Sequence, residues 1–302
     1  KAKKLVNWDV VLKTAISDLE VDQREVNSQL YYINYPIENS DKFITIATTR
    51  PETMLGDSAI AVNPKDDRFK DIVGKLVTIP LANRKIKVIT DDYADPEQGT
   101  GAVKITPAHD FNDYDVGIRN KLEVINIFTP DGKINDNAPD PYKGLDRFAA
   151  RKLILEHLEE GKFLEKIEKL INKVPYGDRS NSIIEPYLTE QWFVDAKTLA
   201  IKAKEVVNNG KTKFFPENWS KTYFQWMNNI EPWCISRQLW WGQQIPVFYF
   251  EGNRFVVAKT KEEALILAQI QNPDTKLEDL RQDEDVLDTW FSSWLWPISV
   301  FD

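Results

Sequence analysis

Residues 99–115 hold more chemically active side chains than any other stretch of the chain. The run GTGAVKITPAHDFNDYD contains a lysine, a histidine, two threonines and three aspartates. Groups of these types bind charged ligands through charge-assisted hydrogen bonds and stabilise charge that develops in a reaction. The four that we expect to share one small polar pocket are Lys104, Thr106, Asp110 and Asp113.

A strand followed by a helix would position these four groups. Residues 102–106 alternate between apolar and polar, which is typical of a half-buried strand, and the proline that follows ends it because it has no N–H for a sheet. Lys104 and Thr106, two positions apart, then point to one side. A helix capped by His109 or Asp110 places both aspartates on one face at its start. The sequence therefore predicts a charged strand-to-helix corner.

Simpler interpretations of the same residues stay open. Aspartate at a helix start is often only a cap, and lysine on a strand is often only solvated. A nucleophilic triad is disfavoured because no Gly-x-Ser-x-Gly turn is present and His157 is the only histidine besides His109. One histidine with two aspartates is a weak metal signal, and we expect no metal.

A second cluster lies at residues 48–53, Thr-Thr-Arg-Pro-Glu-Thr. The β-branched run before it predicts a strand over residues 43–49, and Pro51 suits the first position of a helix. Free amides at a helix start can receive an anion, so Arg50 is a candidate ligand for phosphate or carboxylate. A structural ion pair is the alternative for Arg50.

Length and composition bound the class of protein. The 302 residues suffice for two domains, and 42% hydrophobic with 28% charged residues is ordinary for a globular chain. A net charge of -8 argues against a general grip on nucleic acid, so any contact with nucleic acid is local. The single Cys234 excludes an internal disulfide, and we expect a cytoplasmic location and no membrane segment. Because the chain starts with lysine, we expect a piece of a longer protein.

The fold class predicted from the pattern is α+β. Short strands at close spacing indicate a barrel-like sheet with helical insertions; their ranges are residues 59–62, 76–81, 85–89, 102–106 and 124–128. Residues 146–160, followed by Gly161, predict an amphipathic helix. Nine of the ten tryptophans lie at or beyond Trp192, which indicates a different domain after about Lys173. There, helices are expected at residues 195–209, 217–229 and 260–270, and a hairpin at 247–257.

Taken together, the motifs resemble a family, the class I aminoacyl-tRNA synthetases for branched aliphatic amino acids, and most closely its valine-specific members. The matching runs, in the family's order, are LVNWD (5–9), TAISDLEV (14–21), TTRPET (48–53), KITPAHDFNDY (104–114), VPYGDR (174–179), WCISRQLWWG (233–242) and DEDVLDTWFSS (283–293). They cover nearly the whole chain.

The resemblance implies a domain organisation. Residues 1–24 would be a lead-in, residues 25–173 the inserted editing domain, and residues 174–302 a mixed α/β segment of the split catalytic domain. The His-x-Gly-His and Lys-Met-Ser-Lys-Ser signatures of adenylate formation are missing from the 302 residues. We therefore expect this chain not to activate an amino acid, with ATP and Mg needed only by a full-length synthetase and no cofactor needed for editing.

The resemblance also implies an activity, hydrolysis of the ester that links a wrongly attached threonine to tRNA(Val). Asp113 would hold the substrate ammonium, Asp110 the threonine hydroxyl, and Lys104 would lie by the ester. The other residues implied at the substrate are Thr48, Thr49, Arg50, Thr53, Thr106 and His109, and Trp241 resembles a residue of the amino-acid pocket wall.

The implied partners are the 3′ acceptor end of tRNA(Val) carrying threonine and the rest of the synthetase chain. Two alternatives stay open. The chain could only bind the acceptor end or serve as a structural insertion, or it could be the editing domain of an isoleucyl- or leucyl-type enzyme. The residue types of the motif around Trp240-Trp241-Gly242 disfavour an isoleucyl- or leucyl-type enzyme.

Overall fold

The computed structural model describes residues 1–301 as two compact units. The N-terminal unit comprises residues 4–189, and the C-terminal unit comprises residues 190–301 together with residues 1–3. The division of the chain by contacts thus falls at residue 189, sixteen residues beyond the functional boundary expected at Lys173. That functional boundary stays a prediction.

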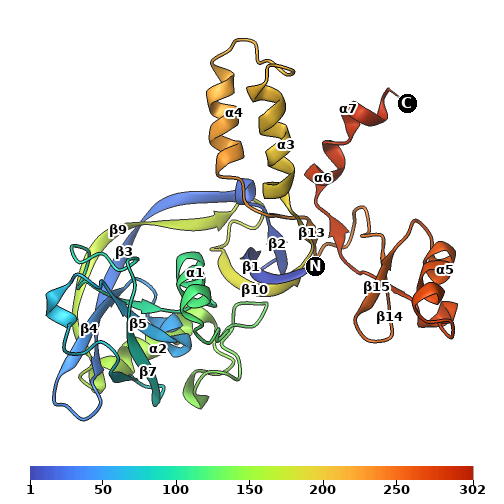
Figure 1. Cartoon of the computed structure of the whole chain (residues 1–302). Coiled ribbons are helices and arrows are strands. Elements are labelled where there is room, and N and C mark those ends of the chain that lie inside the picture. Colours follow the sequence, from blue (N-terminus) through green and yellow to red (C-terminus); the bar gives the residue numbers. More distant parts are fainter. Residues whose placement is uncertain (302) are drawn as a thin grey trace. The chain divides into compact units, whose positions relative to one another are not determined.

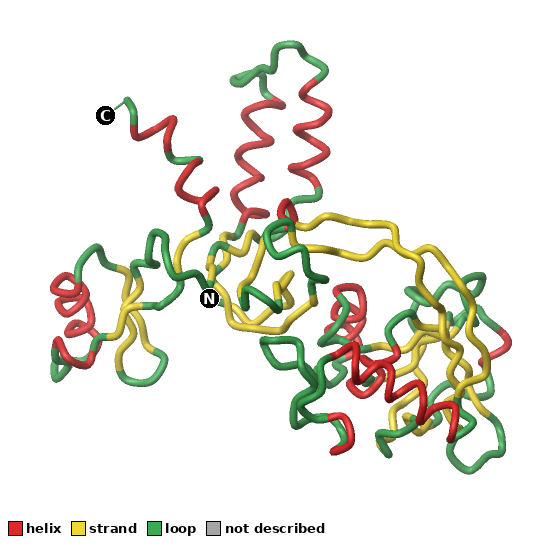
Figure 2. Tube along the Cα trace, turned by 180° about the vertical axis from the view of Figure 1, so that it is seen from behind, coloured by secondary structure: helices red, strands yellow, loops and turns green. Residues whose placement is uncertain are grey.

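A long bent ribbon organises the N-terminal unit (Figure 1). Strand β3 (Val21–Pro36) pairs antiparallel with β9 (Leu164–Gly177) along nearly its whole length, and β4 (Phe43–Thr48) pairs with the second half of β3. A bulge between Tyr32 and Ile33 shifts the β3–β9 register. Such bulges bend a strand and increase its twist, and Figure 2 shows both strands following one curved path.

A second sheet has the strand order β6-β7-β5-β8. Its members are β5 (Ala59–Val62), β6 (Leu76–Ile79), β7 (Arg84–Thr90) and β8 (Ala102–Ile105). The four residues of β5 are all buried, in line with a central strand covered on both faces. One apolar core joins this sheet to the β4-β3-β9 sheet and to α2 (Arg147–Glu160), which contributes Ala150, Ile154 and Leu158.

The α+β class and four of the five short strands are confirmed, but the strand expected at residues 124–128 is wrong. Only an isolated bridge joins Phe128 to Ile134 there. The backbone N–H groups of Ile127 and Phe128 donate instead to side chains, those of His109 and Asn126. A closed barrel is not confirmed, because the strands of residues 1–301 form separate sheets. Between the β4-β3-β9 sheet and the β6-β7-β5-β8 sheet, the described residues form a single isolated β-bridge, from Ile37 to Val77.

The N-terminal unit also contains further strands, another helix and short 3₁₀ turns. They are β1 (Ala2–Asp9), β2 (Thr14–Ile16), α1 (Phe111–Asn120), β10 (Glu185–Gln191) and the short 3₁₀ turns η1 (Asp18–Glu20), η2 (Pro51–Gly56), η3 (Asp67–Phe69) and η4 (Asp140–Tyr142). Strands β10, β1 and β2 form a three-stranded sheet in which β10 is an edge strand and β1 lies in the middle.

The C-terminal unit contains two antiparallel helices, a small sheet covered by a helix, and two short terminal helices. Its elements are β11 (Phe193–Val194), α3 (Ala196–Asn208), α4 (Trp219–Asn228), β12 (Trp233–Cys234), β13 (Ser236–Arg237), β14 (Val247–Phe250), β15 (Arg254–Val257), α5 (Lys261–Gln271), η5 (Leu277–Asp279), β16 (Arg281–Gln282), β17 (Val286–Leu287), α6 (Thr289–Ser293) and α7 (Trp296–Ser299). The three helices and the hairpin expected in this region are confirmed.

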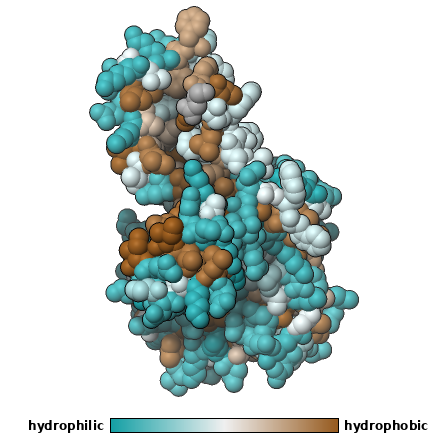
Figure 3. Space-filling view, turned by 90° about the vertical axis from the view of Figure 1, so that its right-hand side faces the viewer, coloured by the Kyte–Doolittle hydropathy of each residue, from teal (hydrophilic) through white to brown (hydrophobic). Residues whose placement is uncertain are grey.

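Large apolar side chains lie exposed on this unit, and Figure 3 shows such side chains gathered in the upper part of its view. They include Trp290 of α6, Trp296 and Ile298 of α7, and the neighbouring Trp294 and Phe301. Among the described residues, no helix combines the length and the apolar character needed to cross a membrane.

Candidate functional site

The predicted strand-to-helix corner is present at the junction of β8 and α1. Asp110 caps α1, and its Oδ1 accepts hydrogen bonds from the backbone N–H groups of Asn112 and Asp113. Asp113 lies in the first turn and is buried, whereas Asp110 is partly exposed. The structure therefore brings the two aspartates to one end of the helix, as their spacing predicts.

Asp113 is held against the end of β8. Its Oδ2 accepts a hydrogen bond of 2.8 Å from the backbone N–H of Thr106. Burial raises the pKa of Asp113 to about 7, with Lys104 opposing the rise and the negative charge of Asp110 adding to it. Near neutral pH this carboxyl therefore exists in both protonation states, and a bound cation would favour the ionised one.

Lys104 lies in a cradle of three oxygen acceptors. Its Nζ donates to the Thr53 hydroxyl at 2.9 Å and to the Thr106 hydroxyl, and it lies 3.3 Å from Asp57 Oδ1. The ammonium has three N–H donors, so this set of acceptors accounts for all of them. Thr53 and Thr106 are almost fully buried, and they contact the lysine from the interior.

Asp57 is a member of this cluster that the sequence analysis missed. It is completely buried, and it accepts hydrogen bonds from the hydroxyls of Thr106 at 2.6 Å and Tyr35 at 2.7 Å in addition to the Lys104 contact. Burial raises the pKa of Asp57, and the charge of Lys104 opposes that rise. Nothing local in the sequence marks Asp57, because its partners lie on β3 and β8.

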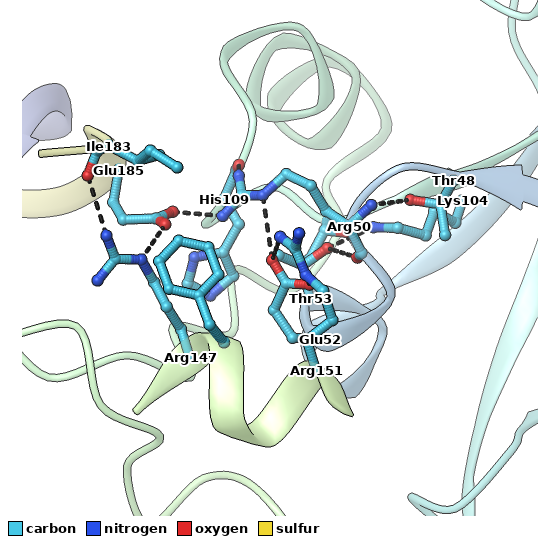
Figure 4. A network of polar contacts seen from close by, with 12 residues as sticks. Thr48, Arg50, Glu52, Thr53, Lys104, His109, Arg147, Arg151, Ile183 and Glu185 are labelled. Carbon is cyan, nitrogen blue, oxygen red and sulfur yellow. Dashed lines mark hydrogen bonds and ion pairs between the residues drawn. The ribbon is translucent and has the colours of Figure 1, made fainter. Parts of the chain in front are cut away.

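Arg50 lies at the start of η2 in a second polar network (Figure 4). Its guanidinium donates to the backbone carbonyl of His109 at 2.9 Å, is ion-paired with Glu185, and lies 3.4 Å from a Glu52 oxygen. Its own backbone N–H donates to the Thr48 hydroxyl. The structure thus supports the ion-pair alternative for Arg50, while 29% of its side chain remains exposed.

The carboxylates of Glu52 and Glu185 were also missed. Arg151 of α2 binds Glu52 with two hydrogen bonds of 2.7 and 2.8 Å, and Arg147 pairs with Glu185 at 2.9 Å. Burial alone would raise the pKa of Glu52, but the bidentate hydrogen bonds of Arg151 outweigh it and hold that pKa below its usual value. The arginines of α2 could have suggested that the helix pairs with buried carboxylates, but they do not indicate which carboxylates these are.

His109 is buried and acts as part of the framework. Its Nε2 accepts a hydrogen bond from the Ile127 N–H, which places the ring proton on Nδ1, and its ring packs edge-on against Phe128. Burial and the nearby Arg50 lower the pKa of His109 well below its usual value, so the ring is neutral. Within residues 1–301, Nδ1 has no hydrogen-bond partner.

The other predicted residues lie in different surroundings. Thr48 is buried at the end of β4, and Thr49 beside it is partly exposed. Trp241 belongs to the C-terminal unit, where 91% of it is exposed. No group of three or more His, Cys, Asp or Glu side chains that could hold a metal ion occurs in residues 1–301.

Comparison with known proteins identifies relatives over the whole chain. The model of the family "tRNA synthetases class I (I, L, M and V)" matches residues 1–302. The chain is 71% identical to a valine–tRNA ligase of Pelagibacter ubique, with 99% of this chain and 34% of that protein covered. It is 53% identical to that of Mesorhizobium japonicum, with 99% and 37% covered, and 51% identical to that of Caulobacter vibrioides, with 99% and 35% covered.

The chain spans about a third of the length of the curated relatives that it matches. Among solved structures, a LeuRS of Agrobacterium radiobacter K84 in a ternary complex with tRNA and LeuAMS has a TM-score of 0.39 at 17% identity, with 98% of this chain and 41% of that chain covered. The resemblance seen in the motifs is thus confirmed over the whole chain. The chain belongs to the class I tRNA synthetases of the I, L, M and V group.

Proposed function

We propose that the N-terminal unit edits mischarged tRNA by hydrolysing the ester of threonyl-tRNA(Val). The observation that carries the proposal is the convergence of Lys104, Asp110 and Asp113 at the β8–α1 corner. The high identity to valine–tRNA ligases supports valine as the amino acid of the full-length enzyme.

A second site is chemically necessary in a valine-specific enzyme. A hydrophobic pocket cannot strongly reject threonine, which replaces a methyl group of valine by a hydroxyl. A polar pocket sorts in the opposite direction, because valine leaves its buried polar groups without hydrogen-bond partners. A charged corner such as the one at α1 suits that task.

In the proposed mechanism, ionised Asp113 binds the α-ammonium of the aminoacyl group and Asp110 binds the threonine hydroxyl. Lys104 lies nearby as a fixed positive charge that stabilises negative charge on the ester oxygen. Water positioned beside the ester is the nucleophile, so no covalent intermediate with the protein forms. Arg50 and the backbone amides near it bind the 3′-terminal adenosine, and Thr48 and Thr49 offer hydroxyls or backbone amides to the attacking water. Thr53 and Thr106 shape the pocket, and Thr53 sets how large a side chain can enter; His109 lies among the residues that bind the substrate.

The proposal extends to the surroundings of the site. Residues 25–173 form the editing domain as a barrel-like insertion, and residues 174–302, with Trp241, belong to the split catalytic domain. Editing requires no cofactor, whereas the full-length ligase uses ATP and Mg. The partners are the acceptor end of tRNA(Val) and the rest of the synthetase, in the cytoplasm.

A deacylation assay tests the activity directly. The 302-residue chain at high concentration is incubated with threonyl-, valyl- and isoleucyl-tRNA, and the remaining ester is measured over time. We expect faster loss of threonyl-tRNA(Val) than of the other two esters. Binding of the acceptor end without hydrolysis would favour the non-catalytic alternative, and preference for another ester would favour an isoleucyl- or leucyl-type site.

The rate of editing should depend on pH through Asp113. Because the raised pKa of Asp113 is about 7, kcat/KM for threonyl-tRNA(Val) should rise about tenfold per pH unit below pH 7. It should level off above pH 7 and fall again as the substrate ammonium, whose ordinary pKa is about 7.7 to 8.0, loses its proton. Rates between pH 5.5 and 8.5, corrected for spontaneous ester hydrolysis, measure this midpoint. A profile without a bend near neutral pH would contradict the need for ionised Asp113.

A further inference from the structure

Asp57 is a fully buried charged group beside the β8–α1 corner. It follows η2 directly, its side chain is fully buried, and it lies between elements that are distant in the sequence. An isolated ionised carboxylate in such a place is strongly disfavoured, so it must be compensated by a cation and by hydrogen bonds. Its compensation comes from the Lys104 ammonium and two hydroxyl donors.

The directions of these hydrogen bonds determine what Lys104 can do. Asp57 accepts the Thr106 hydroxyl proton, and the Arg50 carbonyl accepts the Thr53 hydroxyl proton. Both threonine oxygens are thereby turned to accept from Nζ of Lys104. With three acceptors in place, Lys104 contributes its charge to the site without needing to donate a hydrogen bond to a substrate.

We propose that Asp57 is a positioning residue, which fixes the Lys104 ammonium in its cradle and thereby sets the charge that the corner presents to a substrate. The inference rests on the proposed editing function and adds to it a residue that touches neither the ester nor the ammonium of the substrate. The charge of Asp57 reaches Asp113 as well, where it opposes ionisation and partly cancels the effect of Lys104.

The charged and titratable neighbours of both carboxyls fix the sign of the effect. The charged and titratable neighbours of Asp57 are Lys104 on β8, Tyr35 on β3 and Arg84 on β7. The corresponding neighbours of Asp113 are Lys104, Asp110, Asp57 and Tyr93. In Asp57→Asn, Asp113 loses a negative neighbour while Lys104 keeps its charge. The pKa of Asp113 should therefore fall.

The test compares Asp57→Asn with Asp92→Asn, which removes the same charge from an exposed position. The Asp113 carboxyl is titrated by NMR with ¹³C-labelled aspartate, and deacylation of threonyl-tRNA(Val) is followed over the same pH range. We expect Asp57→Asn to lower the Asp113 midpoint and to reduce kcat at least tenfold, with KM within about twofold. Asp92→Asn should change neither the Asp113 midpoint nor kcat.

The outcomes separate the two proposals. An Asp113 midpoint and a kcat that both stay unchanged in Asp57→Asn would overturn the role of Asp57, because a carboxyl that positions Lys104 affects both quantities. A shifted midpoint in a chain that hydrolyses no threonyl-tRNA would leave the electrostatic role of Asp57 standing and would overturn the editing function.

A second variant covers the case in which Asp57→Asn fails to fold. Tyr35→Phe keeps every charge and removes only the hydroxyl that donates to Asp57 Oδ2. We expect it to reduce kcat about three- to tenfold at unchanged KM. Full activity in folded Tyr35→Phe, together with an unfolded Asp57→Asn, would count against a positioning role.

Discussion

Replacing Asp113 by asparagine should reduce kcat/KM for deacylation of threonyl-tRNA(Val) by about 30-fold to 3000-fold. Loss of a buried, hydrogen-bonded charge opposite an ammonium costs at least about 2 kcal/mol and up to about 4.7 kcal/mol, which corresponds to that range. Asparagine keeps an oxygen that can accept the Thr106 N–H, so it removes the charge and preserves the shape better than alanine would. Single-turnover deacylation of purified variants measures the effect.

Stability provides a check on the same variant. The pKa of Asp113 is raised in the folded protein, so the folded protein retains its proton from about pH 4 to pH 7 while the unfolded chain releases it. Ionisation of Asp113 therefore reduces the free energy of unfolding across this range. Asp113→Asn escapes that loss and should be at least as stable as the parent chain at pH 8, which excludes unfolding as the cause of inactivity.

The matched control is Asp115→Asn, an exposed position two residues further along α1. It removes the same charge from the same helix and should keep deacylation within about twofold of the parent rate. Equal losses in Asp113→Asn and Asp115→Asn would mean that helix charge matters and that Asp113 has no specific role. A fully active Asp113→Asn would exclude the ammonium-binding assignment.

Replacing Glu52 by glutamine should destabilise the N-terminal unit by about 3 to 5 kcal/mol. The Glu52 carboxylate is buried and neutralises Arg151 through two hydrogen bonds, so its loss leaves a guanidinium that is only 26% exposed without its bidentate partner. Because the folded-state pKa of Glu52 is lowered, its contribution is complete above about pH 4.5 and is lost as the pH falls further. Urea unfolding at pH 7 and at pH 4 measures both effects.

Asp140→Asn is the control for this prediction. The ion pair of Asp140 with Lys143 lies at the surface, with 92% of the Asp140 side chain exposed, and such pairs contribute little. We expect its urea midpoint to match that of the parent chain. If Glu52→Gln also left the midpoint unchanged at pH 7, the arginine cluster would not depend on Glu52 for its stability.

Short-range features of the site could be predicted from the sequence. The alternation before Pro107 indicated β8, and the Asp110 cap fixed the start of α1, because strand pleating and helix capping act between residues one to four positions apart. The same short-range logic located α2 and the helices of the C-terminal unit. The motifs themselves indicated the family to which the chain belongs.

Longer-range features could not be predicted in this way. Residues 124–128 have a strand-like composition, yet their N–H groups are taken by the side chains of His109 and Asn126, which a pattern of apolar residues does not register. Many short strands suggested a barrel, but whether strands close into one depends on pairings between distant segments. The sequence contains no local signal for such pairings.

The sequence by itself thus determined the local elements, the charged corner and the family. Tertiary structure alone decided which charges became buried partners: Glu185 meets Arg50 across 135 positions, Arg151 meets Glu52 across 99, and Asp57 meets Lys104 across 47. The physical reason is that a buried charge needs a partner within a few ångströms in space, and only the folded path of the chain determines which distant residue lies there.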